Sequence, residues 1–167
     1  MADLTKEERA ALDRIPLLED PEKLRALIAN ARRMKSTVVS RAAFARLCEV
    51  QPEATPGTVE FDVWQSIHAL EEMLREERGK TVRLSRTRQK IARDGEAKTV
   101  ADLTLRPEAS AGFNDLVERG HAQLTFEAVV LTHPKTFDTD IQAAARARLE
   151  GAGFNTAPLE KRESQDG

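Results

Sequence analysis

Residues 58–79 read TVEFDVWQSIHALEEMLREERG, and this stretch decides the fold class of the chain. Its large apolar side chains recur every three or four positions, which is the spacing of one face of an α-helix. They are Val63, Ile67, Leu70 and Leu74, flanked by Phe61, Trp64 and Met73. Thr58 is a favourable N-cap and Gly79 a favourable helix-ending residue, so the pattern predicts a helix from Val59 to Arg78. An apolar face this wide usually packs against more than one neighbour.

Helix signals continue on both sides of this segment. Thr5 with Glu8 matches a capping box, and Asp20 before Pro21 matches an N-cap followed by a first-turn proline. Residues 124–133 have the composition of a strand, but no partner strand is evident, so we interpret them as a helix. Further helices are expected over 21–34, 37–50, 97–105, 110–119 and 138–151. The sequence therefore predicts an all-α fold, a compact multi-helix domain of about seven or eight helices.

The clearest interruption in the chain is QPEATPG at residues 51–57, which contains two prolines and a glycine. Two amphipathic helices joined by a short break near Lys35-Ser36 precede it, and such a pair folds back as a hairpin. We accordingly predict an N-terminal helical hairpin region over 1–51 and a main helical domain over 58–154. Residues 155–167 are polar and unpatterned, which is typical of a disordered tail.

Composition narrows the class of protein. The chain has 167 residues, enough for a core without disulfides, and its one cysteine, Cys48, excludes a disulfide framework within the chain. The N-terminal residues lack the apolar stretch of a secretory signal peptide. The longest apolar run, at residues 128–131, is far too short to span a membrane. We expect a cytoplasmic protein with no membrane partner.

Motifs for catalysis are missing from the sequence. It contains no phosphate-binding loop, no dinucleotide fingerprint and no nucleophile elbow. The histidines His68, His121 and His133 do not have the spacing of a metal site. His68 and Glu71 share a helical face, where an acid–base or metal pair is geometrically possible, but the favoured interpretation is a solvated polar edge of a long helix. The sequence predicts no enzyme, no metal and no cofactor.

Charge is unevenly distributed along the chain. The net charge of the whole chain is −2, but residues 23–93 hold fifteen basic and eight acidic residues, a net charge of +7. The flanking segments are acidic, with net charges of −4 over 1–22 and −5 over 94–167. Such asymmetry is a hint of an electrostatic partner surface.

The tightest basic run extends from Arg78 to Arg93 and contains no acidic residue. Four of its cations are expected on one face of a helix that opens at Thr81 or Ser85, because their spacing is i, i+3, i+7 and i+10. This face comprises Arg83, Arg86, Lys90 and Arg93, with Arg78, Lys80 and Arg88 supporting it. Arginine suits bidentate contacts to phosphate or guanine. With no tyrosine and one tryptophan, the chain is poorly supplied for stacking single-stranded bases.

These observations predict that the protein binds double-stranded nucleic acid, DNA more readily than RNA, through a basic amphipathic helix. One competing interpretation pairs the same cations internally with Glu71, Glu72, Glu76 and Glu77 of the preceding helix. Another makes the protein a helical interaction or adaptor module, bound to a protein partner or to a second copy of itself. In that case Phe61, Trp64 and Met73 would be the anchors, provided that they project outward.

Overall fold

The computed structural model describes residues 3–160, and all of its secondary structure is helical within that range. Nine α-helices and two short 3-10 helices follow one another along the chain, with a final helical turn over 157–160. The predicted all-α class is confirmed, whereas the predicted count of seven or eight helices is too low. The chain divides into two compact units, Met1–Pro52 and Glu53–Gly167, which are described separately.

The first unit is built on a helical hairpin of α2 (Pro21–Arg33) and α3 (Thr37–Val50), preceded by α1 (Lys6–Arg14) and the 3-10 helix η1 (Ile15–Leu17). Local capping chemistry sets the helix starts. The Thr5 and Glu8 side chains exchange hydrogen bonds with each other's backbone N–H groups, and the Asp20 carboxylate accepts from Glu22 N–H. The hairpin turn passes through Lys35, which has a left-handed backbone (φ 59°). The capping box and the Asp20 cap are therefore confirmed.

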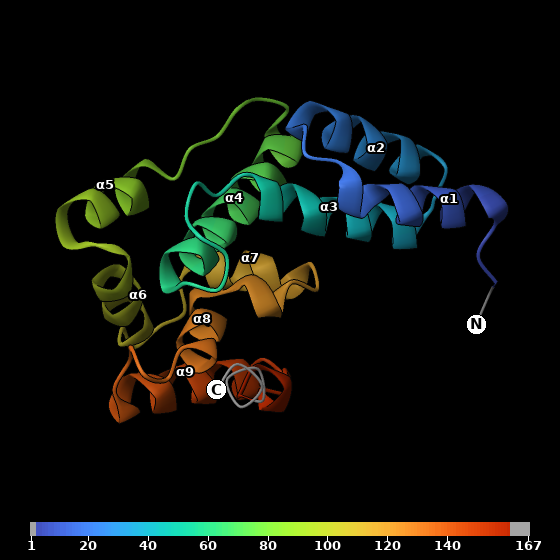
Figure 1. Cartoon of the computed structure of the whole chain (residues 1–167). Coiled ribbons are helices and arrows are strands. Elements are labelled where there is room, and N and C mark those ends of the chain that lie inside the picture. Colours follow the sequence, from blue (N-terminus) through green and yellow to red (C-terminus); the bar gives the residue numbers. More distant parts are fainter. Residues whose placement is uncertain (1–2, 161–167) are drawn as a thin grey trace. The chain divides into compact units, whose positions relative to one another are not determined.

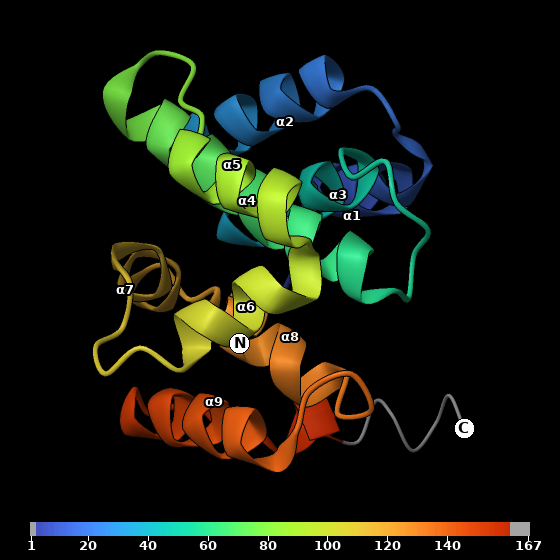
Figure 2. The same cartoon turned by 90° about the vertical axis from the view of Figure 1, so that its left-hand side faces the viewer.

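The second unit is arranged around the long helix α4 (Val59–Arg78), drawn in green in Figure 1. Six helices follow: α5 (Ser85–Asp94), α6 (Glu96–Thr104), α7 (Ala111–Glu118), η2 (Ala122–Leu124), α8 (Phe126–Thr132) and α9 (Thr139–Gly151). Helices α8 and α9 lie against each other, and α4 contacts α6, α7 and α8 (Figures 1 and 2). The segment around 124–133 is a helix, as the sequence predicted.

One hydrophobic core fills the second unit. It draws Val63 and Ile67 from α4, Val100 from α6, Val130 from α8 and Leu149 from α9, each of them almost fully buried. Several neighbouring helices thus cover the wide apolar face of α4, which is what its pattern predicted.

The core extends beyond residue 155. Leu159 is only 5% exposed and belongs to the hydrophobic cluster, whereas the sequence predicted a disordered tail from 155 onward. The sequence pattern missed this residue because one buried leucine between polar neighbours has no periodicity to detect. The rest of the predicted tail, residues 161–167, lies outside the described residues. Over the described part of the chain, no helix is long and apolar enough to cross a lipid bilayer.

Candidate nucleic-acid interface

The basic run begins at the end of α4 and continues into α5. Gly79 ends α4 in the left-handed conformation (φ 67°), and residues 80–84 then run to α5 without helical structure. Because α5 starts at Ser85, Arg83 is not part of it, so the predicted four-cation face over Arg83, Arg86, Lys90 and Arg93 is wrong in its first member. The cause is a tertiary contact, since the Leu84 N–H donates to Glu71 Oε2 (2.8 Å) and fixes the helix start there.

Arg93 at the end of this run is 69% exposed but bound to Asp94, and four further cations near its start are exposed to solvent. They are Arg78, Lys80, Arg83 and Arg86, and we refer to them as the exposed basic segment. Within residues 3–160, none of the four forms an ion pair. They lie within nine consecutive residues that contain no carboxylate. The segment therefore presents a local charge of +4 to solvent.

Arg88 has a different environment. Its guanidinium binds Glu71 through two hydrogen bonds, Nε to Oε2 (2.8 Å) and Nη2 to Oε1 (2.6 Å). It also lies over the ring of Trp64, 5.1 Å from the centroid, in a cation–π arrangement. Burial favours the neutral form of Glu71, but the hydrogen bonds from Arg88 and Leu84 outweigh it and hold the pKa of this carboxyl below its usual value. Arg88 therefore fastens α5 to α4.

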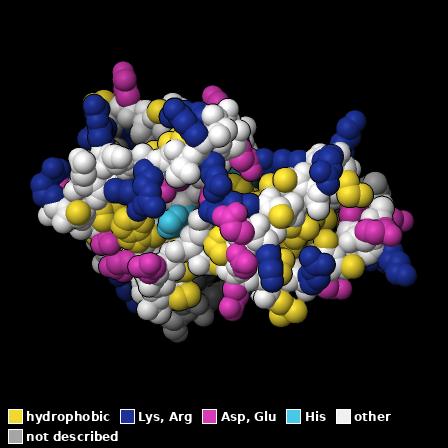
Figure 3. Space-filling view, turned by 90° about the horizontal axis from the view of Figure 1, so that it is seen from above, with side chains coloured by type: hydrophobic (Ala, Val, Ile, Leu, Met, Phe, Trp, Pro, Cys, Tyr) yellow, Lys and Arg dark blue, Asp and Glu magenta, His cyan; other side chains and the backbone are white. Residues whose placement is uncertain are grey.

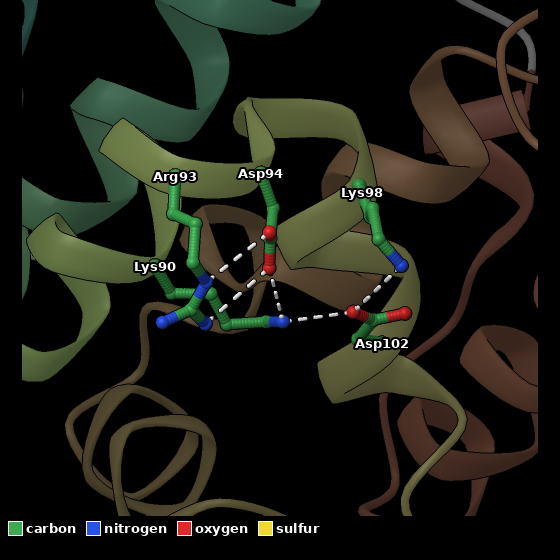
Figure 4. Close-up of polar contacts among 5 residues, drawn as sticks. All are labelled: Lys90, Arg93, Asp94, Lys98 and Asp102. Atoms are coloured by element: carbon green, nitrogen blue, oxygen red, sulfur yellow. Dashed lines mark hydrogen bonds and ion pairs between the residues drawn. The ribbon is translucent and has the colours of Figure 1, made fainter.

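Lys90 and Arg93 are also engaged by carboxylates, as Figure 4 shows. Lys90 Nζ lies 2.9 Å from Asp94 Oδ2 and 2.8 Å from Asp102 Oδ2, so it links α5 to α6. Arg93 donates from Nε to Asp94 Oδ1 (3.3 Å), and Lys98 reaches Asp102 (3.4 Å). These hydrogen bonds raise the pKa of Lys90 and lower those of Asp94 and Asp102. The three cations and two carboxylates of this network leave a net charge of only +1.

The seven predicted cations thus separate into two groups. The exposed basic segment is available to an external anion, whereas Arg88, Lys90 and Arg93 are paired within the second unit. The internal-pairing interpretation applies to Glu71, but Glu77 pairs instead with Arg119, the residue that follows α7. On the face drawn in Figure 3, Lys and Arg side chains are interspersed with Asp and Glu rather than gathered in one continuous patch. An anion would therefore meet a local cluster rather than a broad basic surface.

Several residues considered for catalysis or protein docking are buried or engaged in other contacts. Both oxygens of Glu71 are occupied by Arg88 and Leu84, and burial lowers the pKa of His68, with the neighbouring charges of Glu71 and Arg88 acting in opposite directions. No cluster of three potential metal ligands occurs in the part of the chain that the structure describes. Phe61 and Met73 are buried, and Trp64 is half-buried and donates to Glu96 Oε1 (3.2 Å).

Sequence reasoning missed a pocket of about 360 Å³ within the second unit. Its wall is mostly apolar and includes Leu70, Leu74 and Phe113, while Arg78 and Arg106 also line it. Glu127 is a wall residue as well, although it is only 4% exposed. No local pattern marks a carboxyl that becomes buried by residues distant in sequence.

Comparisons with protein-family models, with curated proteins and with solved structures found no match to this chain.

Proposed function

We propose that this protein binds duplex nucleic acid through the exposed basic segment. The observation that carries the proposal is the presence of four exposed cations, Arg78, Lys80, Arg83 and Arg86, with no ion-pair partner in residues 3–160. The binding face differs from the one that the sequence predicted, because it excludes the paired cations Arg88, Lys90 and Arg93.

Electrostatics distinguishes the two groups of cations. A phosphate that contacts an unpaired arginine releases condensed counterions and disrupts no existing ion pair. Lys90 must instead break its ion pairs with Asp94 and Asp102 before it binds a phosphate, so the net gain in binding free energy is small. We therefore assign affinity to the exposed basic segment and a positioning role to the paired cations.

The anchoring of α5 supports binding in a second way. Residues 80–84 have no helical structure of their own, but Leu84 and Arg88 both bind Glu71 at their C-terminal side, and Arg78 closes α4 at their N-terminal side. The connection is thus fixed at both ends. Fixing it before binding reduces the conformational entropy lost when the cations meet phosphates.

A duplex fits this surface better than a single strand. Proteins that bind single strands commonly stack bases on exposed aromatic rings. The only tryptophan, Trp64, is half-buried and covered by the guanidinium of Arg88. We propose that recognition consists of phosphate neutralisation without a catalytic step. We also propose a cytoplasmic location, in keeping with the single cysteine, Cys48, which is a buried thiol.

The test compares two variants that each lose four positive charges. One replaces Arg78, Lys80, Arg83 and Arg86 with glutamine, and the other replaces the exposed cations Lys6, Arg9, Arg14 and Lys135. Binding to labelled duplex DNA and duplex RNA is measured by fluorescence anisotropy at low salt, after circular dichroism has confirmed folding. We expect the first variant to lose at least about tenfold in affinity and the second less than about threefold. Equal losses would mean that general charge, not this segment, governs binding.

A protein partner is the second candidate, and one observation favours it. Leu17 and Met34 in the first unit are 79% and 74% exposed, which is unusual for large apolar side chains. Phe61 and Met73, which the sequence suggested as anchors, are buried, so Leu17 and Met34 take their place as candidate anchors. If the protein dimerises, light scattering should show a mass that falls to the monomer value when Leu17 and Met34 are changed to serine. An unchanged mass would exclude these anchors from the contact between copies.

A further inference from the structure

The pocket of the second unit is large enough for a small organic molecule. Its volume of about 360 Å³ is within the range of ligand pockets in proteins, which have mostly apolar walls and a few polar groups. The apolar wall includes Ile67, Leu70, Leu74, Phe113 and Leu116. Residues from α4, α6, α7 and α8 contribute to it, so it lies within one unit of the chain.

Glu127 is the polar group in this wall that lacks full hydrogen bonding. The residue is the second of α8 and is 4% exposed, and its Oε2 has no hydrogen-bond partner among the described residues. A buried acceptor without a donor costs about 1–3 kcal/mol, which a ligand that supplies the donor can recover. The pocket therefore favours a ligand with a hydrogen-bond donor beside an apolar body.

Several arginines lie around Glu127, but none of them forms a hydrogen bond with its carboxyl in residues 3–160. The charge of Arg148 in α9 acts on Glu127, but its guanidinium donates to the carbonyl oxygens of Leu103 and Arg106 and forms no hydrogen bond with the carboxyl. Arg78 and Arg106 line the pocket and are exposed, and Asp115 faces Arg119. Burial raises the pKa of Glu127 to about 7 even with Arg148 nearby. The low-dielectric wall therefore disfavours the carboxylate until a cation accompanies it.

We propose that this pocket binds a small amine with an apolar body, whose ammonium group pairs with the Glu127 carboxylate. The apolar body would lie against Leu70, Leu74 and Phe113, and the ammonium would donate to the carboxylate of the wall residue Glu127. The positive charges of Arg78 and Arg106 repel an ammonium group, but both side chains are exposed to solvent, where charge interactions are screened. Glu127 is buried, where a charge pair is stronger. The proposal does not depend on nucleic-acid binding.

Three probes that differ only in their end group separate the possible ligands. They are 3-phenylpropylamine, 3-phenylpropanol and 3-phenylpropionate, each titrated into the full-length protein and followed by NMR chemical shifts. The amine should bind at least about tenfold more tightly than the alcohol or the acid, and the affected amides should include those of α8. Tighter binding of the acid would overturn the proposal and assign the pocket to anions held by Arg78 and Arg106.

Glu127→Gln keeps the size of the side chain and removes its charge, so it should abolish the preference for the amine. Glu118→Gln, at an exposed position of the same unit, is the matched control and should preserve that preference. An amine preference that survives Glu127→Gln in a folded variant contradicts the proposal.

The pH dependence of the wild-type protein gives a test without any substitution. Only the ionised carboxyl pairs with the ammonium, so the apparent affinity scales with the ionised fraction of Glu127. Between pH 6 and pH 8 this fraction rises about tenfold for a pKa near 7, and amine affinity should rise by the same factor. His133 is at the other end of α8 and is bound to Asp62, so it does not face the pocket carboxyl. An affinity independent of pH, or no binding of any probe, would refute the assignment.

Discussion

At the scale of single residues, Arg88 illustrates how a cation that looks functional in sequence becomes structural in the fold. Its side chain is 23% exposed and that of Glu71 is 11% exposed, so the pair is largely removed from water. The bidentate geometry and the Trp64 ring together hold the guanidinium in place. We expect a residue fastened in this way to contribute to stability rather than to recognition of a partner.

Replacing Arg88 with alanine should therefore destabilise the protein. We expect a loss of about 2 kcal/mol in the free energy of unfolding, because Glu71 would keep its charge without its main partner. Arg86→Ala, at an exposed position two residues away, should change it by less than about 0.5 kcal/mol. Urea unfolding followed by Trp64 fluorescence measures both. Equal effects of the two substitutions would contradict the anchoring role of Arg88.

The same pair predicts a pH dependence. The pKa of Glu71 is lowered in the folded protein, so its stabilising contribution is present above its ordinary value of 4.5 and is lost as pH falls through the lowered value. The difference in stability between wild type and Arg88→Ala should accordingly shrink in strong acid.

Glu127 affects the pH dependence of folding stability in the opposite direction. Its pKa is raised from 4.5 to about 7 by burial, so the folded state binds more protons than the unfolded state between these values. This group should make wild-type stability fall by about 3 kcal/mol as pH rises through that window. In Glu127→Gln this fall should vanish, whereas Glu118→Gln should retain it. Unfolding free energies at pH 4.5, 6 and 8 test this, and a parallel pH profile in Glu127→Gln would refute it.

At the scale of the helix, α5 is held on two sides and presents unpaired cations only near its start, since the exposed Arg93 in its last turn is bound to Asp94. Arg88 binds α4, and Lys90 reaches Asp102 of α6 (Figure 4). The paired side chains lie within the helix, while Arg83 and Arg86 lie just before it and in its first turn. Binding should therefore depend on position along the run rather than on the number of charges.

Two double variants with the same loss of charge test this dependence. Arg83→Gln with Arg86→Gln should weaken duplex binding by about tenfold or more at low salt, because two phosphate contacts disappear. Lys90→Gln with Arg93→Gln should weaken it by less than about threefold, since these cations already neutralise carboxylates. Anisotropy titrations compare the two variants. An equal loss of affinity in both would support the continuous basic face that the sequence predicted as the binding surface.

How far the sequence could predict these elements depends on the range of the interactions. The caps at Thr5, Asp20 and Thr58 were predictable because each hydrogen bond spans two or three residues. The start of α5 was not, because it depends on Glu71, thirteen residues before Leu84. The burial of Glu127 depends on packing between α8 and helices far from it in sequence, so no local pattern could reveal the pocket.

At the scale of the whole molecule, net charge does not favour a nucleic-acid partner, because the chain carries −2. Attraction must then come from a local excess of positive charge. The second unit provides one in the exposed basic segment, while its remaining basic side chains include several that are paired with Asp or Glu, such as Lys90, Arg119 and Arg146. A binding surface this small predicts moderate affinity and few phosphate contacts.

The salt dependence of duplex binding tests the central claim most directly, because it counts the phosphates that the protein neutralises. Each contact contributes about −0.9 to the slope of log affinity against log salt concentration on duplex DNA. With four contacts the wild-type slope should approach about −3.6, and the variant with glutamine at Arg78, Lys80, Arg83 and Arg86 should give a slope near zero. A wild-type slope that the four substitutions leave unchanged, or no binding to either duplex at low salt, would contradict the account.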